Sequence, residues 1–309
     1  MNELMRAVRA SRRGGAEELV LENIPKTDPA SDEALIEVHA TAITFAELTW
    51  DETWTHVPAI PGHEFSGVVA AIGDDVQGFS VGDEVYGLIR FERQGAAADY
   101  VAVPAADLAR KPASLSHAEA AAMPLAALTA LQALSDVAQV KTGERVLVQG
   151  GSGGVGIFAV QLAKAAGAIV TATTRGDGVE LVRRLGADEV IDTDVDAFAD
   201  GGRRFDVVID TIGADVLRAS YDVVVKGGRL VTLQQPPDAE LAERAGITAS
   251  FFIVSPDVDE LEQLARLADE GQLEVILAAE FPLEATRQAF ESGQGTHRSP
   301  GKTVVIVRE

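Results

Sequence analysis

The chain has 309 residues, of which 47% are hydrophobic and 24% charged, a composition typical of a folded globular protein. It contains no cysteine, which excludes disulfides, thiolate catalysis and thiolate-bound metals. Its formal net charge of −22 disfavours nucleic acid as a partner, because a polyanion repels the phosphate backbone. The sequence shows no apolar run long enough to span a membrane and no signal peptide, so we expect a cytoplasmic protein without a membrane partner.

The first 110 residues have the pattern of short strands separated by glycine-containing turns. The predicted strands are Met5–Ala10, Glu17–Glu22, Ala34–Ala40, Gly67–Ile72, Glu84–Leu88 and Ala98–Val103. No amphipathic helix interrupts them, which favours a small antiparallel, barrel-like domain.

The pattern changes near Ser116, which together with Glu119 predicts a capping box at the start of a helix. Strands and helices then alternate. The predicted strands are Arg145–Gln149, Ile169–Thr173, Glu189–Ile191, Phe205–Asp210 and Gly228–Leu233, and the helices between them are Val155–Ala166, Gly178–Leu185 and Asp215–Val225. Apolar strands that alternate with helices indicate a parallel sheet covered on both faces, in an α/β protein. An amphipathic helix over Asp257–Asp269 and a strand over Thr303–Val307 complete the prediction.

The clearest chemical motif lies between the strand Arg145–Gln149 and the helix after it. Gly151, Gly153 and Gly156 fit the G-x-G-x-x-G spacing, in the strand–turn–helix context that dinucleotide binding requires. In such a motif the first glycine permits the tight turn, the second admits a pyrophosphate, and the third lets helix and strand approach. We therefore expect Ser152, Gly153, Gly154 and Val155 to hold the pyrophosphate at a helix N-terminus. The alternative is an ordinary glycine-rich connection.

The end of the second strand of this region predicts which nucleotide is bound. An NAD site places a carboxylate there to bind the ribose hydroxyls, but this chain has Thr173, Thr174 and Arg175. Hydroxyls and a guanidinium suit a 2′-phosphate, which predicts NADPH as the cofactor. In the alternative interpretation Arg175 is only solvated and Asp177 reaches the ribose.

Several strings of this sequence resemble the medium-chain dehydrogenase/reductase superfamily, quinone oxidoreductase branch. They include PGHEFSGVVAAIG (61–73), AAAMPLAALTALQAL (120–134), VLVQGGSGGVG (146–156) and GKTVV (301–305). The resemblance implies a GroES-like antiparallel β-barrel domain over residues 1–120, completed by 275–309, and a Rossmann domain, a doubly wound parallel sheet that binds NADPH, over 121–274. It also implies an active site in the cleft between the domains, and a homodimer.

Zinc-dependent members of the superfamily resemble this chain at His63 and Glu64, but they need a further ligand, normally cysteine, near Thr44. Threonine is a poor zinc ligand, so we predict a zinc-independent protein in which His63 is structural. Without a metal, the favoured reaction is hydride transfer from NADPH to a quinone or an α,β-unsaturated carbonyl, whose developing oxyanion needs only hydrogen-bond donors. The alternatives are an enoyl-thioester reductase and a non-catalytic NADPH-binding redox sensor.

The remaining predicted site residues come from the resemblance and from local pattern. For the catalytic positions, Thr129 is expected beside the nicotinamide, Thr44 as a hydrogen-bond donor, and Tyr86 as a proton donor or a packed barrel tyrosine. Trp50, Trp54 and His56 lie in one loop and are predicted to form a substrate lid, or else to anchor the core or a dimer. Further cofactor contacts are expected from Ile212, Phe252, Val254, His297, Arg298 and Lys302.

Overall fold

A computed structural model describes residues 3–295 and 298–308. The chain forms two compact units, each built from more than one stretch of sequence. The first unit comprises Met1–Leu125, Ser255–Arg298 and Lys302–Glu309, and the second comprises Ala126–Val254 and Ser299–Gly301. In the part of the chain that the structure describes, every helix is too short or too polar to cross a membrane.

The first unit contains most of the β-structure, with three short helices of its own. Its strands are β1 (Leu4–Ala10), β2 (Leu19–Pro25), β3 (Glu33–Ala42), β4 (Glu64–Ile72), β5 (Glu84–Leu88), β6 (Tyr100–Pro104), β7 (Ala109–Arg110), β14 (Leu277–Pro282) and β15 (Lys302–Ile306). Its helices are α1 (His117–Ala121), α7 (Val258–Asp269) and α8 (Thr286–Glu291). Ser116 and Glu119 form the predicted capping box at the start of α1.

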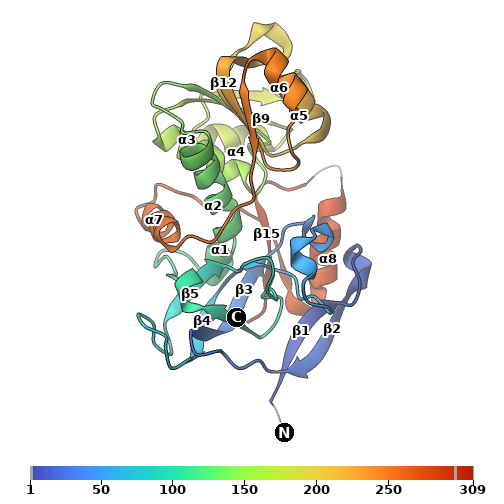
Figure 1. The fold of residues 1–309 in the computed structure, drawn as a ribbon, viewed down its shortest axis with the longest axis vertical. Helices are drawn as coiled ribbons and strands as arrows, with labels where there is room; N and C mark the ends of the chain where they lie inside the picture. The colour runs from blue at the N-terminus through green and yellow to red at the C-terminus, as the bar shows by residue number, and fades with distance from the viewer. Residues whose placement is uncertain (1–2, 296–297, 309) are drawn as a thin grey trace. The chain divides into compact units, whose positions relative to one another are not determined.

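A seven-stranded sheet organises this unit, in the order β14-β15-β3-β4-β5-β7, with β6 also pairing with β3. All of its pairs are antiparallel except β14 with β15. Apolar side chains of β3 and β4, including Ile36, Val38 and Phe65, are fully buried in the core. Strands β1 and β2 form a separate antiparallel pair, drawn in dark blue beside α8 in Figure 1. The predicted antiparallel β-domain is thus confirmed.

The second unit is an α/β sheet. Its strands are β8 (Arg145–Gln149), β9 (Ile169–Thr174), β10 (Glu189–Asp192), β11 (Phe205–Asp210), β12 (Val224–Thr232) and β13 (Thr248–Phe251). Its helices are α3 (Gly156–Ala165), α4 (Gly178–Arg184), α5 (Ala214–Ser220) and α6 (Ala239–Ala245), while α2 (Pro124–Gln132) begins in the first unit and continues into the second. The helices surround the sheet in Figure 1.

All strand pairs of this sheet are parallel, in the order β10-β9-β8-β11-β12-β13. Counted along the chain, this is the order 3-2-1-4-5-6 of the Rossmann fold. The predicted doubly wound sheet is confirmed. The order reverses at β8, so the ends of β8 and β11 form the switch point where such sheets bind nucleotides.

Two details differ from the sequence prediction. The helix expected to reach Val225 ends at Ser220, and β12 already begins at Val224. A register shift against β11 accommodates Gly227, whose φ of +80° favours glycine. In addition, α7 belongs to the first unit, whereas the sequence placed it in the nucleotide-binding domain. Its Leu261 carbonyl accepts a hydrogen bond from the Tyr86 hydroxyl at 2.6 Å, a contact between residues 175 positions apart.

Candidate functional site

The glycine-rich turn connects β8 to α3 through a very close backbone approach. Gly150 has a φ of +70°, so the left-handed residue is Gly150, whereas the sequence pattern pointed to Gly151. A Cβ on Gly156 would lie 2.0 Å from the Gly150 carbonyl oxygen, and a Cβ on Gly151 would lie 2.9 Å from the Ala172 Cβ on β9. These spacings explain why the turn is built from glycine.

Hydrogen bonds tie the turn to the end of β9. The Gly150 N–H donates to Thr173 Oγ1 at 3.0 Å, and the Gly151 N–H donates to the Thr173 carbonyl at 2.7 Å. The Ser152 and Thr174 hydroxyls are 2.6 Å apart. The turn then leads into α3, where the N–H groups of Ile157, Phe158 and Ala159 donate to the carbonyls of Gly153 and Val155 that precede the helix. Such a helix start suits an anion, including a pyrophosphate.

The end of β9 lacks a carboxylate of its own, but acidic residues lie close to it. The Arg175 side chain is 63% exposed and its Nε is 3.8 Å from Asp194 Oδ1. Strand β10 pairs Asp192 with Thr174, which brings the acidic end of β10 alongside β9. The sequence analysis missed this neighbourhood because 19 positions separate Arg175 from Asp194. Asp177, the alternative ribose ligand, precedes α4 and is exposed.

A buried carboxylate shapes the loop after β11. Asp210 is fully buried and accepts hydrogen bonds from the Ile212 N–H at 3.1 Å, the Gly213 N–H at 3.0 Å and the Thr232 hydroxyl at 3.2 Å. Ile212 is 51% exposed, and a Cβ on Gly150 would lie 2.6 Å from its Cδ1. The two loops at the switch point are therefore adjacent. The string VVID signals a strand end, but not that its aspartate orders the following loop.

The other predicted cofactor residues of the second unit are also placed. Phe252 is half-buried just after β13, and Val254 is 9% exposed. Thr129 lies on α2 and is 7% exposed.

In the first unit, the tryptophan loop is partly a structural anchor. The Trp54 indole N–H donates to the Leu48 carbonyl at 3.0 Å, and its ring packs on the core. Trp50 meets the Phe91 ring edge-on at a centroid distance of 5.4 Å, while His56 is exposed. Trp54 thus favours the anchoring alternative, whereas Trp50 is half-buried against Phe91 and His56 is exposed. Thr44, the predicted donor, is half-buried just after β3.

His63 belongs to a buried polar cluster. Its Nδ1 contacts a carboxylate oxygen of Glu47, which also accepts the Gly62 N–H at 2.7 Å. Its Nε2 lies 3.0 Å from the Arg93 carbonyl oxygen. Both ring nitrogens therefore face oxygen atoms of the protein, so each is already engaged by a partner within the fold. This supports the structural role that the sequence predicts for His63.

Glu64 is likewise committed to partners within the protein. One carboxylate oxygen binds the Lys302 ammonium, and the other accepts the Leu125 N–H at 3.0 Å. Burial raises the pKa of Glu64, and the positive charge of Lys302 opposes this rise. Lys302 also donates to the Ile43 carbonyl at 3.3 Å, and its side chain is 6% exposed. In this structure the Lys302 ammonium is therefore engaged by Glu64, and its contact with the cofactor stays a prediction.

A zinc ion does not fit these residues. Thr44 is a poor ligand, the His63 ring has no free nitrogen, and Glu64 is already paired. Among the described residues, no group of three or more His, Cys, Asp or Glu side chains is arranged to hold a metal ion.

Arg298 stacks over the Phe45 ring at 4.9 Å, beside Thr44 in the sequence, and His297 lies outside the described residues. Tyr86 is fully buried, its hydroxyl proton is donated to Leu261, and burial raises its pKa. This geometry favours the packed barrel tyrosine over the proton donor.

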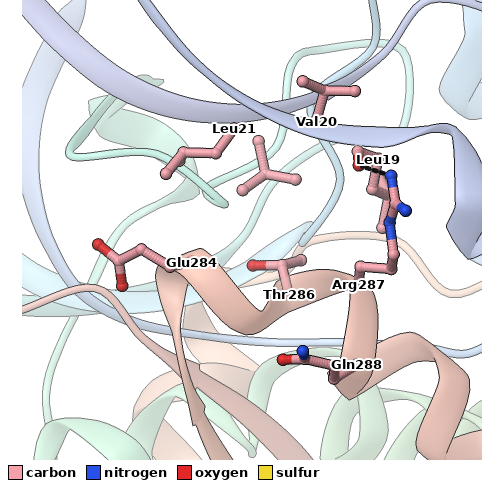
Figure 2. A pocket seen from close by; sticks show the side chains of 8 residues that line it. Leu19, Val20, Leu21, Glu284, Thr286, Arg287 and Gln288 are labelled. Carbon is pink, nitrogen blue, oxygen red and sulfur yellow. Dashed lines mark hydrogen bonds between the residues drawn. The ribbon is translucent and has the colours of Figure 1, made fainter.

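A groove with a volume of about 280 Å³ lies elsewhere in the first unit, between β2 and α8. Figure 2 shows the groove between Leu19, Val20 and Leu21 on one side and Glu284, Thr286, Arg287 and Gln288 on the other, and Arg287 donates to the Leu19 carbonyl at 2.8 Å. None of the residues that line the groove is a predicted site residue.

Comparison with known proteins agrees with this fold. A family profile described as zinc-binding dehydrogenase matches residues 185–305, and one described as alcohol dehydrogenase GroES-like domain matches residues 30–113. A probable zinc-binding oxidoreductase, mitochondrial, from Arthroderma benhamiae is 35% identical over 94% of this chain and 93% of that protein. The 2-methylene-furan-3-one reductase of Solanum lycopersicum is 34% identical over 94% of this chain and 76% of that protein. The solved quinone oxidoreductase from Coxiella burnetii is 30% identical, with a TM-score of 0.91 over 99% of this chain and 100% of that one.

The two sheets, the glycine-rich turn at the switch point and these relatives define an oxidoreductase. The chain belongs to the medium-chain dehydrogenase/reductase superfamily, among the quinone oxidoreductase homologues.

Proposed function

We propose that this protein is an NADPH-dependent oxidoreductase that transfers hydride, without a metal, to a quinone or an α,β-unsaturated carbonyl compound. The observation that carries the proposal is the turn from Gly150 to Gly156. This turn joins the switch point of a parallel sheet to a helix N-terminus. The Ser152 hydroxyl in the turn contacts the Thr174 hydroxyl at the end of β9, and the next residue is the exposed Arg175 instead of a carboxylate.

The second unit is the proposed nucleotide-binding domain. Residues Gly151–Gly156 would hold the pyrophosphate, and Thr174 and Arg175 the 2′-phosphate, with Thr173 fixing the turn. Thr129, Ile212, Phe252 and Val254 are proposed to contact the nicotinamide half, and Arg298 of the first unit a cofactor phosphate. When bound, NADPH supplies the hydride from the C4 atom of its nicotinamide ring.

The first unit is the proposed acceptor-binding domain. The Thr44 hydroxyl would donate to the oxygen that becomes negative as hydride reaches carbon. The half-buried Trp50 and the exposed His56 are proposed to contact the acceptor. The names of two relatives support this substrate class, because one reduces a 2-methylene-furan-3-one and the other is a quinone oxidoreductase.

Steady-state NADPH oxidation by the purified protein tests the proposal. We expect turnover with 1,4-benzoquinone, 9,10-phenanthrenequinone or an alkenal, unaffected by chelator. Turnover only with an enoyl thioester would establish the alternative reductase. Saturable NADPH binding without oxidation by any acceptor would indicate a redox sensor, and absence of NADPH binding would refute the proposal.

The predicted homodimer is proposed to form along the second unit's sheet. Strand β13 pairs only with β12 among the described strands, and Phe251 at its end is 36% exposed. An unpaired edge strand can extend its sheet by pairing with a second copy. Sedimentation tests this assembly, and fractionation of the host cell tests the predicted cytoplasmic location.

A further inference from the structure

A single buried carboxylate touches the chain where it passes from one unit to the other. The chain passes between the units at four places, and two of them matter here: the step from Leu125 to Ala126 and the step from Gly301 to Lys302. Glu64 binds the residue on the first-unit side of both passages, since it accepts the Leu125 N–H and pairs with the Lys302 ammonium. These partners are 61 and 238 positions away from Glu64 in the sequence.

The first passage leads into α2. Leu125 is the second residue of α2, and its N–H is among those that a helix start leaves without an intrahelical partner. A carboxylate at this end also interacts favourably with the helix dipole. Thr129 follows Leu125 by four residues, about one helical turn. A contact to the Leu125 N–H therefore acts on the start of the helix that carries Thr129.

The second passage leads away from the glycine-rich turn. The Gly301 N–H donates to the Ser152 carbonyl at 2.9 Å, and the φ of Gly301 is +101°. The next residue, Lys302, starts β15, and its ammonium is held by Glu64 and by the Ile43 carbonyl. Neither charged side chain of the pair is more than 6% exposed, so solvent screens the pair weakly.

We propose that Glu64 and Lys302 are positioning residues for hydride transfer. Their ion pair fixes the start of α2, the helix that carries Thr129. It also fixes the start of β15, which directly follows Gly301, the residue bonded to the glycine-rich turn. The kinetic part of this inference rests on the proposed function. The structural part concerns only the protein's own residues and can be tested without cofactor.

Hydrogen–deuterium exchange of the full chain without cofactor tests the structural part. In Glu64→Gln the side-chain amide offers an oxygen to only one partner, so we expect exchange to rise about tenfold in at least one of the segments 124–132 and 302–306. Asp107→Asn is the matched control, because Asp107 is also a buried carboxylate of the first unit, paired with Arg90 at 2.7 Å. We expect the control to leave both segments unchanged. Unchanged exchange in both segments of Glu64→Gln would overturn the inference.

A variant that removes both charges covers the case in which Glu64→Gln does not fold, since a broken buried pair leaves an unpaired charge. In Glu64→Gln/Lys302→Met the amide oxygen can still accept the Leu125 N–H, whereas the Lys302 contact is lost. We expect exchange to rise in 302–306 but not in 124–132. Protection of both segments at the wild-type level would contradict the role of the pair.

Kinetics separates positioning from a simple contribution to stability. In Glu64→Gln we expect kcat to fall about tenfold or more, because small misplacements of reacting groups slow a reaction strongly. We also expect a larger isotope effect with C4-deuterated NADPH, and a Kd for NADPH within about threefold of wild type. A lower Tm with unchanged kcat and isotope effect would overturn the inference. A raised Kd for NADPH with unchanged kcat would also overturn it, because the pair would then contribute to cofactor binding and not to the position of the reacting groups. If the wild type reduces no acceptor, the proposed function fails, while the exchange result still decides whether the pair holds both segments.

Discussion

The glycine-rich turn of the second unit and the buried charges of the first unit differ in how they are encoded. The turn is local, because its glycines lie within seven consecutive residues and their spacing predicts a function directly. The ion pairs of the first unit join distant residues, such as Glu64 and Lys302, 238 positions apart. Taken singly in the sequence, His63, Glu64 and Lys302 suggest zinc or cofactor ligands, but in the fold these side chains bind partners within the protein. A motif is therefore most informative when its parts are neighbours in the chain.

The largest effect is expected inside the turn, from Gly156→Ala. The added Cβ would lie 2.0 Å from the Gly150 carbonyl oxygen, so backbone must move and we expect NADPH binding to be lost, with about 3 kcal/mol of stability. Gly153→Ala is the matched control for stability, because its Cβ would lie 3.3 Å from the same oxygen and should cost about 1 kcal/mol or less. It should still weaken NADPH binding, because the added methyl group lies where the pyrophosphate is proposed to approach. NADPH titration and urea unfolding measure these effects; equal losses of stability in the two variants would show that the close approach is unimportant.

The next largest effect is on the stability of the first unit, and NADPH binding by the second unit should be unaffected. Glu47→Gln removes the charge that holds His63 and weakens a buried pair, which should cost about 3 kcal/mol. The Kd for NADPH should stay within about twofold, because the nucleotide lies on the other unit in our proposal. The control is Glu22→Gln, which breaks a partly exposed pair with Arg9 that is worth about 1 kcal/mol or less. A large loss of NADPH affinity in Glu47→Gln would contradict the separation of roles.

Nucleotide choice should change with Arg175. Arg175→Ala is expected to raise the Kd for NADPH about tenfold and leave the Kd for NADH nearly unchanged, because only NADPH carries the 2′-phosphate. Asp194→Asn should modestly strengthen NADPH binding, since the carboxylate lies 3.8 Å from Arg175 and competes with the phosphate. Fluorescence titration with both nucleotides measures these changes. Equal weakening of both nucleotides by Arg175→Ala would refute the phosphate contact.

The smallest effect is a pH dependence in the first unit. The His117 ring stacks on His39 at 4.2 Å and its Nδ1 lies 2.8 Å from the Ser66 hydroxyl. Burial, followed by the proximity of His39, lowers the pKa of His117 to about 4, although Glu84 opposes the shift. Between pH 6.5 and 4 the unfolded chain therefore binds a proton at this position that the folded chain does not, so stability falls as pH falls.

His117→Asn should remove this proton linkage while keeping a partner for Ser66. We expect the wild type to lose a few degrees more in Tm than the variant between pH 7 and pH 4.5. Thermal melts across this range measure the difference. Parallel pH profiles for the two proteins would show that His117 does not titrate as described.

Much of the fold could be predicted because its signals are local. The strands Glu84–Leu88, Arg145–Gln149 and Phe205–Asp210 have the predicted bounds, each being an apolar run between turn residues. The predicted bounds are wrong at Val224. This segment was predicted as helix from its periodicity, but in the structure it pairs with β11 as the start of β12. Here a tertiary contact outweighed the local pattern.

The candidate site was predictable only in part, for the same reason. The glycine-rich turn and Thr174 follow from spacing within one strand–turn–helix unit. The register of β10 against β9 brings Asp194 close to Arg175, and Asp210 binds backbone N–H groups of the loop after β11. Neither contact can be derived from the spacing of residues in the sequence. Lys302 is predicted from the sequence to contact the cofactor, and no local pattern reveals that its ammonium pairs with Glu64 in the fold.

The hydrogen bond from Gly301 to Ser152 bears on how members of this superfamily can be recombined. Residues Ser299–Gly301 belong to the second unit although 44 residues of the first unit precede them. A chimera that exchanges only the continuous stretch 126–254 would join a donor's turn to a recipient's tripeptide. Successful grafts should therefore transfer both pieces, and natural recombination between relatives should favour breakpoints that keep the two pieces from the same parent.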